Sequence, residues 1–285
     1  MRSIILNRLE DLFYFHQWLA KTNFGRGSTL KKIAIYGKGG IGKSTAALGI
    51  SRSLCARGRS VLLCDKVVQI GCDPKSDSTK NLMGGKGIPT VLEQIKAKGD
   101  DLKVEDIVFT GFGGVLCIEA GGPTPGVGCA GRGIITAFEK LEELQFFEKY
   151  QPDVVLYDVL GDVVCGGFAM PIRGGYAQDV YVVSSGEMMS LFAANNIATA
   201  IKGFGKRGYA KLQGLILNKK NIENEDEIVR KACEEIGTSI VATIPRCGDI
   251  QIAENQGCTV LEALPESEMC EIYRALARDM MKVGK

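Results

Sequence analysis

Residues 37–44 read Gly-Lys-Gly-Gly-Ile-Gly-Lys-Ser and form the stretch of this sequence with the clearest chemistry. The pattern G-x-x-x-x-G-K-S/T is typical of a phosphate-binding loop, in which glycines let several backbone N–H groups point into one concavity. In such a loop Lys43 reaches the β- and γ-phosphates and Ser44 holds Mg²⁺. The positive end of a helix that begins near Lys43 adds to the attraction for phosphate. The spacing therefore predicts a nucleoside triphosphate site.

The same glycines also fit the dinucleotide fingerprint G-x-G-x-x-G at Gly37, Gly39 and Gly42, and Asp65 could serve as its ribose-binding acid. A dinucleotide loop has no use for Lys and Ser directly after its last glycine, whereas a triphosphate bound with Mg²⁺ uses both. The sequence therefore favours the phosphate loop over the dinucleotide site.

Two carboxylates follow the apolar run Val154–Tyr157 further along the chain. Asp158 ends this run, which is the Walker-B arrangement, where an Asp beside the phosphate loop supports Mg²⁺ and its waters. Asp162 follows in a segment that contains glycines, and it could position or deprotonate the attacking water. A loop-capping Asp is the competing interpretation of Asp162 from the residues alone.

Two of the ten cysteines have surroundings that suit metal ligation. Cys129 lies within residues 126–133 and Cys165 precedes Gly166 and Gly167, so each stands where a glycine-rich loop enters an expected helix. Helix N-termini and free amides stabilise thiolates and an anionic cluster that the thiolates hold. A cubane iron–sulfur cluster takes four thiolates, so two identical chains could share one cluster on a two-fold axis. Ordinary buried cysteines are an equal alternative from the residues alone.

Five other cysteines indicate packing rather than ligation. Cys55, Cys233 and Cys270 fall on expected helices and Cys72 and Cys117 at expected strand ends, where a thiol is a small buried hydrophobe. No two cysteines form C-x-x-C, which weakens an interpretation as a zinc ribbon or a thioredoxin-like motif. Free thiols beside a phosphate loop favour a reducing, cytoplasmic compartment.

The composition is that of an ordinary globular chain. The 285 residues are 45% hydrophobic and 24% charged, which allows one large domain with a sizeable core. The net charge of +2 gives no support to a nucleic-acid partner, and the longest apolar runs are far too short for a membrane span. We therefore expect neither nucleic acid nor a membrane as a partner.

From residue 31 onward, short apolar runs alternate with helical stretches, which predicts a doubly wound, mostly parallel α/β sheet. The loops that follow the strands then share one edge, where ligands bind. Residues 61–65 and 68–73 look like two versions of one strand ending, and we expect the second in the sheet because it leads into residues 74–79. The expected strands are 33–36, 67–72, 115–119, 154–158, 180–183, 212–217 and 240–244. The expected helices are 43–56, 90–98, 133–144, 187–204, 225–236 and 266–281.

Residues 1–30 precede the first expected strand and are interpreted as an N-terminal appendage of no assigned role. Glu10 and Asp11 interrupt the segment, so it lacks the apolar run of a signal peptide. The predicted organisation is this appendage followed by one ATPase domain over residues 31–285.

Five motifs together resemble the nitrogenase iron protein family. Lys38 gives the phosphate loop the deviant form K-G-G-x-G-K-S/T, which is typical of dimeric ATPases that include this family, plasmid-partition proteins and arsenite pumps. The resemblance runs from about residue 33 to the end of the chain, and it implies a deviant-Walker phosphate-loop NTPase. The motifs are GKGGIGKST, GCDPKSDST, GGPTPGVGCAGRG, YDVLGDVVCGGFAMPIR and SGEMMSLFAANNI.

The resemblance implies a homodimer of ATP-binding subunits bridged by one 4Fe–4S cluster. In that family the dimer passes single electrons to a larger catalytic component, coupled to hydrolysis of MgATP, and it receives them from ferredoxin or flavodoxin. Cys129 and Cys165 match the cluster ligands, and Arg132 matches an arginine beside the cluster on the face where the larger component docks.

The resemblance also implies the roles of residues around the nucleotide. Residues 73–77 match a first switch that senses the γ-phosphate and Mg²⁺, and residues 158–165 match a second switch that links the nucleotide to the cluster through the backbone. The implied nucleotide-binding residues are Gly37, Lys38, Gly39, Gly40, Ile41, Gly42, Lys43, Ser44, Thr45, Lys75, Asp158, Asn218, Pro245, Arg246 and Gln251. The implied catalytic residues are Lys38 (toward the facing subunit), Asp73 and Asp162, and the implied Mg²⁺ ligands are Ser44 and Asp77.

The chain departs from the family pattern at several places. It carries an insertion near residues 61–67, Ser184 stands where the family has a cysteine, and the longer family tail is missing after Arg278. The SGEMM and AMPIR motifs favour the nitrogenase branch, whereas the missing tail favours a divergent member. The substrate of the larger component therefore stays open among N₂, a nickel tetrapyrrole and a thioether. A cluster-free partition or positioning ATPase is the alternative function, but it leaves Cys129 and Cys165 unexplained.

Overall fold

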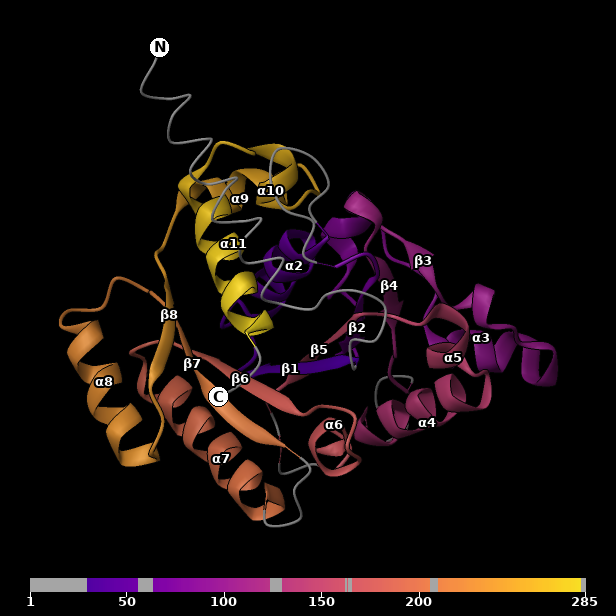
Figure 1. Ribbon diagram of the computed structural model, residues 1–285, viewed down its shortest axis with the longest axis horizontal. Coiled ribbons are helices and arrows are strands. Elements are labelled where there is room, and N and C mark those ends of the chain that lie inside the picture. The colour runs from indigo at the N-terminus through magenta and orange to yellow at the C-terminus, as the bar shows by residue number, and fades with distance from the viewer. Residues whose placement is uncertain are drawn as a thin grey trace.

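One sheet of eight strands lies at the centre of the computed structural model, which describes residues 30–55, 64–123, 130–161, 163, 166–205 and 210–282 (Figure 1). The strand order is β3-β4-β2-β5-β1-β6-β7-β8, and only β3 runs antiparallel to its neighbour within these ranges. The strands are β1 (Lys31–Gly37), β2 (Val67–Cys72), β3 (Phe109–Thr110), β4 (Leu116–Glu119), β5 (Val154–Leu160), β6 (Asp179–Ser184), β7 (Lys211–Asn218) and β8 (Ile240–Ile244).

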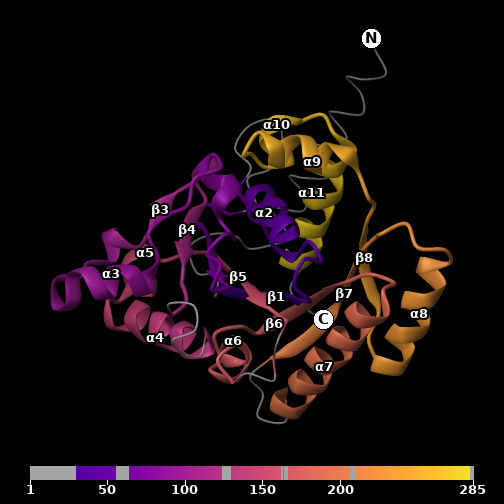
Figure 2. The same ribbon diagram turned by 180° about the vertical axis from the view of Figure 1, so that it is seen from behind.

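Helices cover both faces of this sheet, as the two opposite views in Figures 1 and 2 show. The α-helices are α2 (Lys43–Leu54), α3 (Val91–Lys98), α4 (Ala130–Glu143), α5 (Phe146–Tyr150), α6 (Met170–Arg173), α7 (Met188–Gly205), α8 (Glu225–Ile236), α9 (Gly248–Asn255), α10 (Val260–Ala263) and α11 (Glu268–Met281). Four short 3₁₀ helices complete the described part: η1 (Lys80–Met83), η2 (Gly99–Asp101), η3 (Val104–Asp106) and η4 (Phe112–Gly114).

Alternation along the buried strands divides the core into two layers. In β1, Ile33 and Ile35 pack into the layer formed with α2, α9, α10 and α11, whereas Ala34 and Tyr36 pack into the layer formed with α3 to α8. Both layers are apolar because a parallel sheet covered by helices buries both of its faces. The sheet is therefore doubly wound, as the sequence predicted.

The carboxyl ends of the parallel strands bring the polar residues of the chain to one edge. Register pairs Gly71 of β2 with both Glu119 of β4 and Asp158 of β5, while Ile35 of β1 also pairs with Asp158. The central strand β1 has β5 on one side and β6 on the other, so the loop after β1 lies where the strand order changes direction. Ligands of open α/β sheets bind at such a point.

The seven predicted strands and six predicted helices are confirmed, with ends that differ by up to three residues. Residues 67–72 are the sheet strand, as expected, and residues 61–63 lie outside the described ranges. The sequence missed β3, α5, α6, α9 and α10, which have two to eight residues each. Elements this short span too few turns for hydrophobic periodicity to identify them.

No helix in the described part of the chain is long and apolar enough to cross a membrane.

Candidate functional site: a nucleotide-binding edge

The phosphate loop joins β1 to α2 at the carboxyl edge of the sheet. Gly42 caps α2 with a φ of +93°, which lies in the left-handed region that favours glycine. A Cβ at this position would lie 2.4 Å from Nδ2 of Asn218, at the end of β7. That amide nitrogen donates a 2.7 Å hydrogen bond to the Ile41 carbonyl. Asn218, predicted from the resemblance alone, is thus held directly against the loop.

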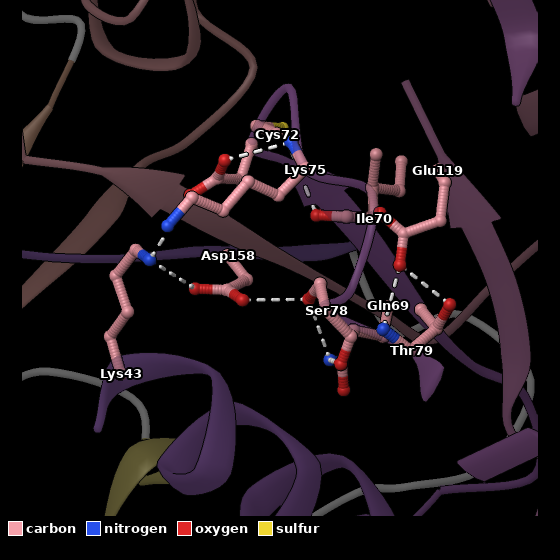
Figure 3. Close-up of polar contacts among 10 residues, drawn as sticks. Lys43, Gln69, Ile70, Cys72, Lys75, Ser78, Thr79, Glu119 and Asp158 are labelled. Carbon is pink, nitrogen blue, oxygen red and sulfur yellow. Dashed lines mark hydrogen bonds and ion pairs between the residues drawn. The ribbon is translucent and has the colours of Figure 1, made fainter. Parts of the chain in front are cut away.

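Lys43 begins α2, and only 5% of its surface is exposed. Its Nζ lies 3.7 Å from Oδ2 of Asp73 and 4.0 Å from Oδ1 of Asp158 (Figure 3). The three side chains come from α2, from the segment that follows β2, and from β5. The structure therefore brings together three predicted residues that are far apart in the sequence. Together with Ser78, we call them the floor of the site.

Asp158 is the most deeply placed group of the floor, with no exposed surface. Its Oδ2 accepts a 2.7 Å hydrogen bond from the Ser78 hydroxyl, whereas its Oδ1 accepts none from a described residue. Burial raises the pKa of Asp158, the charge of Lys43 and the hydroxyls of Ser44 and Ser78 lower it, and the charge of Asp73 raises it. A buried carboxylate oxygen without a hydrogen bond is costly, so Oδ1 is available to a metal-bound water.

Residues 73–77 turn sharply after β2 and carry charges outward. Oδ1 of Asp73 accepts a 3.0 Å hydrogen bond from the backbone N–H of Lys75, and Ser76 has a φ of +53°. Asp73 is buried, whereas Lys75 and Asp77 are exposed. The predicted first switch therefore spans the site from its floor to its surface.

Three charged residues of the phosphate loop and of the 73–77 segment are exposed. Lys38 is exposed together with Gly39 and Gly40, while Ile41 is buried beneath the loop. We call Lys38, Lys75 and Asp77 the rim.

The first turn of α2 also contacts the C-terminal helices. Ser44 and Thr45 are half-buried, and the Thr45 hydroxyl donates a 2.9 Å hydrogen bond to Oε1 of Glu254 on α9. Pro245 and Arg246 follow β8 and are exposed, as is Gln251 on α9, whose amide donates to Asn255 at 3.0 Å. The bond between Thr45 and Glu254 places this stretch beside the phosphate loop.

The described residues that follow the two singled-out cysteines approach each other closely. Cys129, Asp162 and Cys165 themselves lie outside the described residues. A Cβ on Gly167 would lie 2.0 Å from the carbonyl oxygen of Gly131, so these two backbones are in direct contact. Gly131 stands two positions after Cys129 and Gly167 two positions after Cys165.

The segment after Cys165 is also tied to the central strand of the sheet. The hydroxyl of Tyr36, the residue before the phosphate loop, donates a 2.8 Å hydrogen bond to the Phe168 carbonyl, and both residues are buried. Strand β1 therefore supports the phosphate loop and the 166–168 segment at once.

The five cysteines expected to pack are buried: Cys55, Cys72, Cys117, Cys233 and Cys270. Burial raises the pKa of the Cys72 thiol and that of the Cys117 thiol, the latter to about 12. These thiols are protonated at neutral pH, and a protonated thiol is a poor ligand. Within the described ranges no group of three or more His, Cys, Asp or Glu side chains could hold a metal ion.

A buried polar network beside the floor was not anticipated from the sequence (Figure 3). Gln69 donates to both the carbonyl and the hydroxyl of Ser78 at 3.0 Å. The backbone N–H and the hydroxyl of Thr79 each donate a 2.7 Å hydrogen bond to Oε1 of Glu119. The available signal was a Glu at the end of an apolar strand, in the run Val115–Glu119.

Comparison with known protein families identifies the family of this chain. A model of the 4Fe–4S iron–sulfur cluster-binding proteins of the NifH/frxC family matches residues 31–285. The chain belongs to the NifH/frxC family. It is 52% identical over 255 residues to the nitrogenase iron protein of Methanospirillum hungatei, covering 88% of each chain. It is 47% identical to the nitrogenase iron protein of Methanococcus voltae, covering 90% of each chain. The family resemblance that the sequence predicted is confirmed.

Solved structures confirm the predicted phosphate-loop fold. The septum site-determining protein MinD of Pyrococcus horikoshii, complexed with Mg-ADP, matches with a TM-score of 0.66 over 89% of this chain and 97% of that chain, at 21% identity. A ParA-family ATPase from Chlorobium tepidum matches with a TM-score of 0.64 over 87% of this chain and 98% of that chain, at 18% identity. At these identities the likeness shows the fold alone. Family membership makes the chain an ATP-hydrolysing reductase component of the nitrogenase iron protein type.

Proposed function

We propose that two copies of this chain hold one 4Fe–4S cluster between them and pass single electrons to a larger catalytic component while they hydrolyse MgATP. Cys129 and Cys165 of each copy supply the four thiolates. Lys43, Ser44, Asp77 and Asp158 bind the phosphates, Mg²⁺ and its waters. The single observation that carries this proposal is the contact between Gly131 and Gly167. Because each glycine stands two positions after a cysteine, the contact favours both thiols reaching one site.

The floor fits MgATP in its donor set. Lys43 provides an ammonium for the β- and γ-phosphates, and Oδ1 of Asp158 is a buried acceptor without a described hydrogen-bond partner. Bound Mg²⁺ neutralises charge that develops on the phosphates during hydrolysis. Asp73 starts the segment that would contact the γ-phosphate, and Asp162 would orient or deprotonate the attacking water.

The cysteine-bearing segments fit an iron–sulfur cluster. Gly131 lies in the first turn of α4, where backbone N–H groups and the helix dipole favour a thiolate and a negatively charged cluster. Any side chain on Gly167 would separate the two segments, so glycine is required there for the approach. The cluster supplies storage and transfer of one electron, while the protein sets its surroundings.

An exposed apolar patch favours the homodimer. Met188, Met189 and Phe192 at the start of α7 are 82%, 58% and 59% exposed. They follow β6, whose end lies beside the phosphate loop because a Cβ on Gly37 would meet the Val183 carbonyl at 2.6 Å. We call these three residues the apolar patch. A second copy that covers this patch would also bring its Lys38 toward the nucleotide of the first copy.

The larger partner would dock beside the cluster. Arg132 is exposed in the first turn of α4, directly after Gly131, and it offers a positive charge at that face. Ferredoxin or flavodoxin would supply the electrons. The chemistry of the partner decides whether N₂, a nickel tetrapyrrole or a thioether is reduced. We also propose that residues 31–285 form the functional ATPase domain, that residues 1–30 are an appendage to it, and that the protein acts in the cytoplasm.

The test is an anaerobic count of iron and sulfide, with an EPR spectrum of the dithionite-reduced protein recorded with and without MgATP. About four irons per dimer and a signal altered by MgATP are expected. Cys129→Ala and Cys165→Ala should each lose the cluster, whereas Cys233→Ala, at a buried packing position on α8, should retain it. A reconstituted wild-type protein without iron that still dimerises with ATP would overturn the proposal in favour of a positioning ATPase.

A further inference from the structure

Glu119 is a buried carboxylate that the proposed function does not use. It ends β4, has no exposed surface, and lies at the same edge of the sheet as the nucleotide floor. Its Oε1 accepts both hydrogen bonds of Thr79, and its Oε2 accepts none from a described residue. Burying such a group costs free energy that an apolar residue of similar size would not incur. Its presence therefore calls for a role.

The local packing is built around this carboxylate. A Cβ on Gly71, its partner on β2, would lie 1.9 Å from Oε2 of Glu119, so only glycine leaves room for it. Burial raises the pKa of Glu119 to about 8, the two bonds from Thr79 lower it, and the charges of Asp158 and Asp77 raise it. The side chain is thus mainly neutral at pH 7 and acts as a hydrogen-bonding group.

Thr79 connects Glu119 to the nucleotide floor. The preceding residue, Ser78, donates to Asp158 at 2.7 Å and is itself held by Gln69 (Figure 3). A displacement of the 73–79 segment when phosphate binds would therefore alter the hydrogen bonds of both carboxylates, that of Asp158 with Ser78 and those of Glu119 with Thr79.

Glu119 in turn leads into residues 120–123, which run toward Cys129 in the sequence. A second contact joins the same two segments, because a Cβ on Gly122 would meet Pro74 at 2.6 Å. Residues 120–123 also contact the start of α4, where the carbonyl of Gly121 lies 3.6 Å from a Cβ placed on Gly133. The 73–79 segment thus contacts residues 119–123 twice, through Thr79 with Glu119 and through Pro74 with Gly122.

We infer that Glu119 is a positioning residue that transmits the nucleotide-dependent position of residues 73–79 to residues 120–123. Residues 120–123 precede Cys129 in the sequence and Asp158 precedes Cys165, so each cysteine follows a segment that is connected to the floor. The inference rests on the proposed nucleotide site.

The test is hydrogen–deuterium exchange of the full chain, with and without a non-hydrolysable ATP analogue and Mg²⁺. In the wild type, nucleotide should change exchange in peptides that cover residues 116–123 and in those that cover residues 166–173. In Glu119→Leu the nucleotide-dependent change over residues 116–123 should fall by roughly half or more, because the contact between Thr79 and Glu119 is lost and only the contact between Pro74 and Gly122 remains. The change over residues 166–173 should persist, because the substitution leaves the bond between Ser78 and Asp158 in place. Glu119→Gln, which keeps a neutral acceptor for Thr79, should behave like the wild type.

Glu142→Gln is the control, because Glu142, on α4 and outside the 73–79 segment, accepts a 2.6 Å hydrogen bond from the Tyr176 hydroxyl. Thr79→Val removes the side-chain donor from the other partner, and it tests the same connection if Glu119→Leu does not fold. An undiminished change over residues 116–123 in the variant that folds would overturn the inference. The affinity for the analogue, measured on the same samples, separates the two proposals. A wild type that does not bind the analogue would overturn both. If the wild type and Glu119→Leu bind the analogue equally and show the same nucleotide-dependent change over residues 116–123, only this inference is overturned.

Discussion

The floor and the rim of the nucleotide site differ in whether the charged groups of one chain are buried against partners or exposed to solvent. In the floor, Lys43, Asp73 and Asp158 are almost fully buried, and Nζ of Lys43 lies within 4.0 Å of a carboxylate oxygen of each Asp. The rim residues Lys38, Lys75 and Asp77 are exposed, and so is the separate apolar patch at the start of α7. Buried charges need partners within the fold, whereas exposed ones keep their hydration until a partner arrives. The floor thus belongs to the fold of a single chain, and the rim offers groups that a second molecule can use.

The largest effect is expected from Lys43→Ala in the floor. The variant removes the ammonium that is proposed to face the phosphates and leaves Asp73 and Asp158 without its positive charge, so ATP hydrolysis should fall by at least ~1,000-fold. Steady-state phosphate release measures this loss. Lys98→Ala, which removes a surface ion pair with Asp106, is the control and should leave hydrolysis unchanged. Comparable losses of hydrolysis in the two variants would contradict a specific role of the floor in ATP hydrolysis.

A smaller and more selective effect is expected from Lys38→Ala at the rim. Hydrolysis should fall by about 100-fold, because in the proposed homodimer the nucleotide loses a positive charge from the facing copy, while the affinity of one chain for ATP changes by less than about threefold. Phosphate release and equilibrium nucleotide binding separate the two quantities. Equal losses in ATP affinity and in hydrolysis would mean that Lys38 acts on the nucleotide of its own chain, as Lys43 does, and would contradict the difference between the rim and the floor.

Phe192→Asp should weaken association of two copies in the presence of MgATP by about tenfold or more, because a charge replaces an apolar anchor. Sedimentation equilibrium with and without nucleotide measures it. Ile228→Asp, at a partly exposed position on α8 outside the apolar patch, should associate normally. If both variants dimerise like the wild type, the patch is not the contact surface.

The last prediction concerns the pH dependence of stability, not hydrolysis or association. The pKa of Glu119 is raised to about 8, so its favourable contribution is complete below the unfolded-state pKa of about 4.3 and is lost as the pH rises toward 8. In Glu119→Gln the free energy of unfolding should therefore depend less on pH between about 4 and 8 than in the wild type. Urea denaturation of the nucleotide-free protein at several pH values provides the measurement, and parallel curves for the two proteins would contradict it.

The sequence predicted the parts of the site that are local. The phosphate loop, the Asp158 strand ending and the choice of residues 67–72 as a strand each depend on patterns within a few residues, and the local backbone expresses them directly. Asp73 and Asn218 came only from the family resemblance, and the structure places both beside the phosphate loop or Lys43.

The contacts that were missed depend on register between distant strands. The bonds between Thr79 and Glu119 require β2 and β4 to pair with Gly71 opposite Glu119, and a single sequence does not contain that alignment. The hydrogen bond from Asn218 to Ile41 likewise depends on β7 and β1 lying on either side of β6. Periodicity gives the elements, whereas the neighbours of each strand are set by packing over the whole sheet.

The contact between Gly131 and Gly167 gives a simple criterion for sorting uncharacterised ATPase sequences that share this fold. A side chain at position 167 would overlap the backbone at position 131, so a chain that carries one must hold these two segments further apart. The residue at this one position of an alignment would therefore separate chains in which the two segments can meet from those in which the same edge of the sheet serves ATP alone.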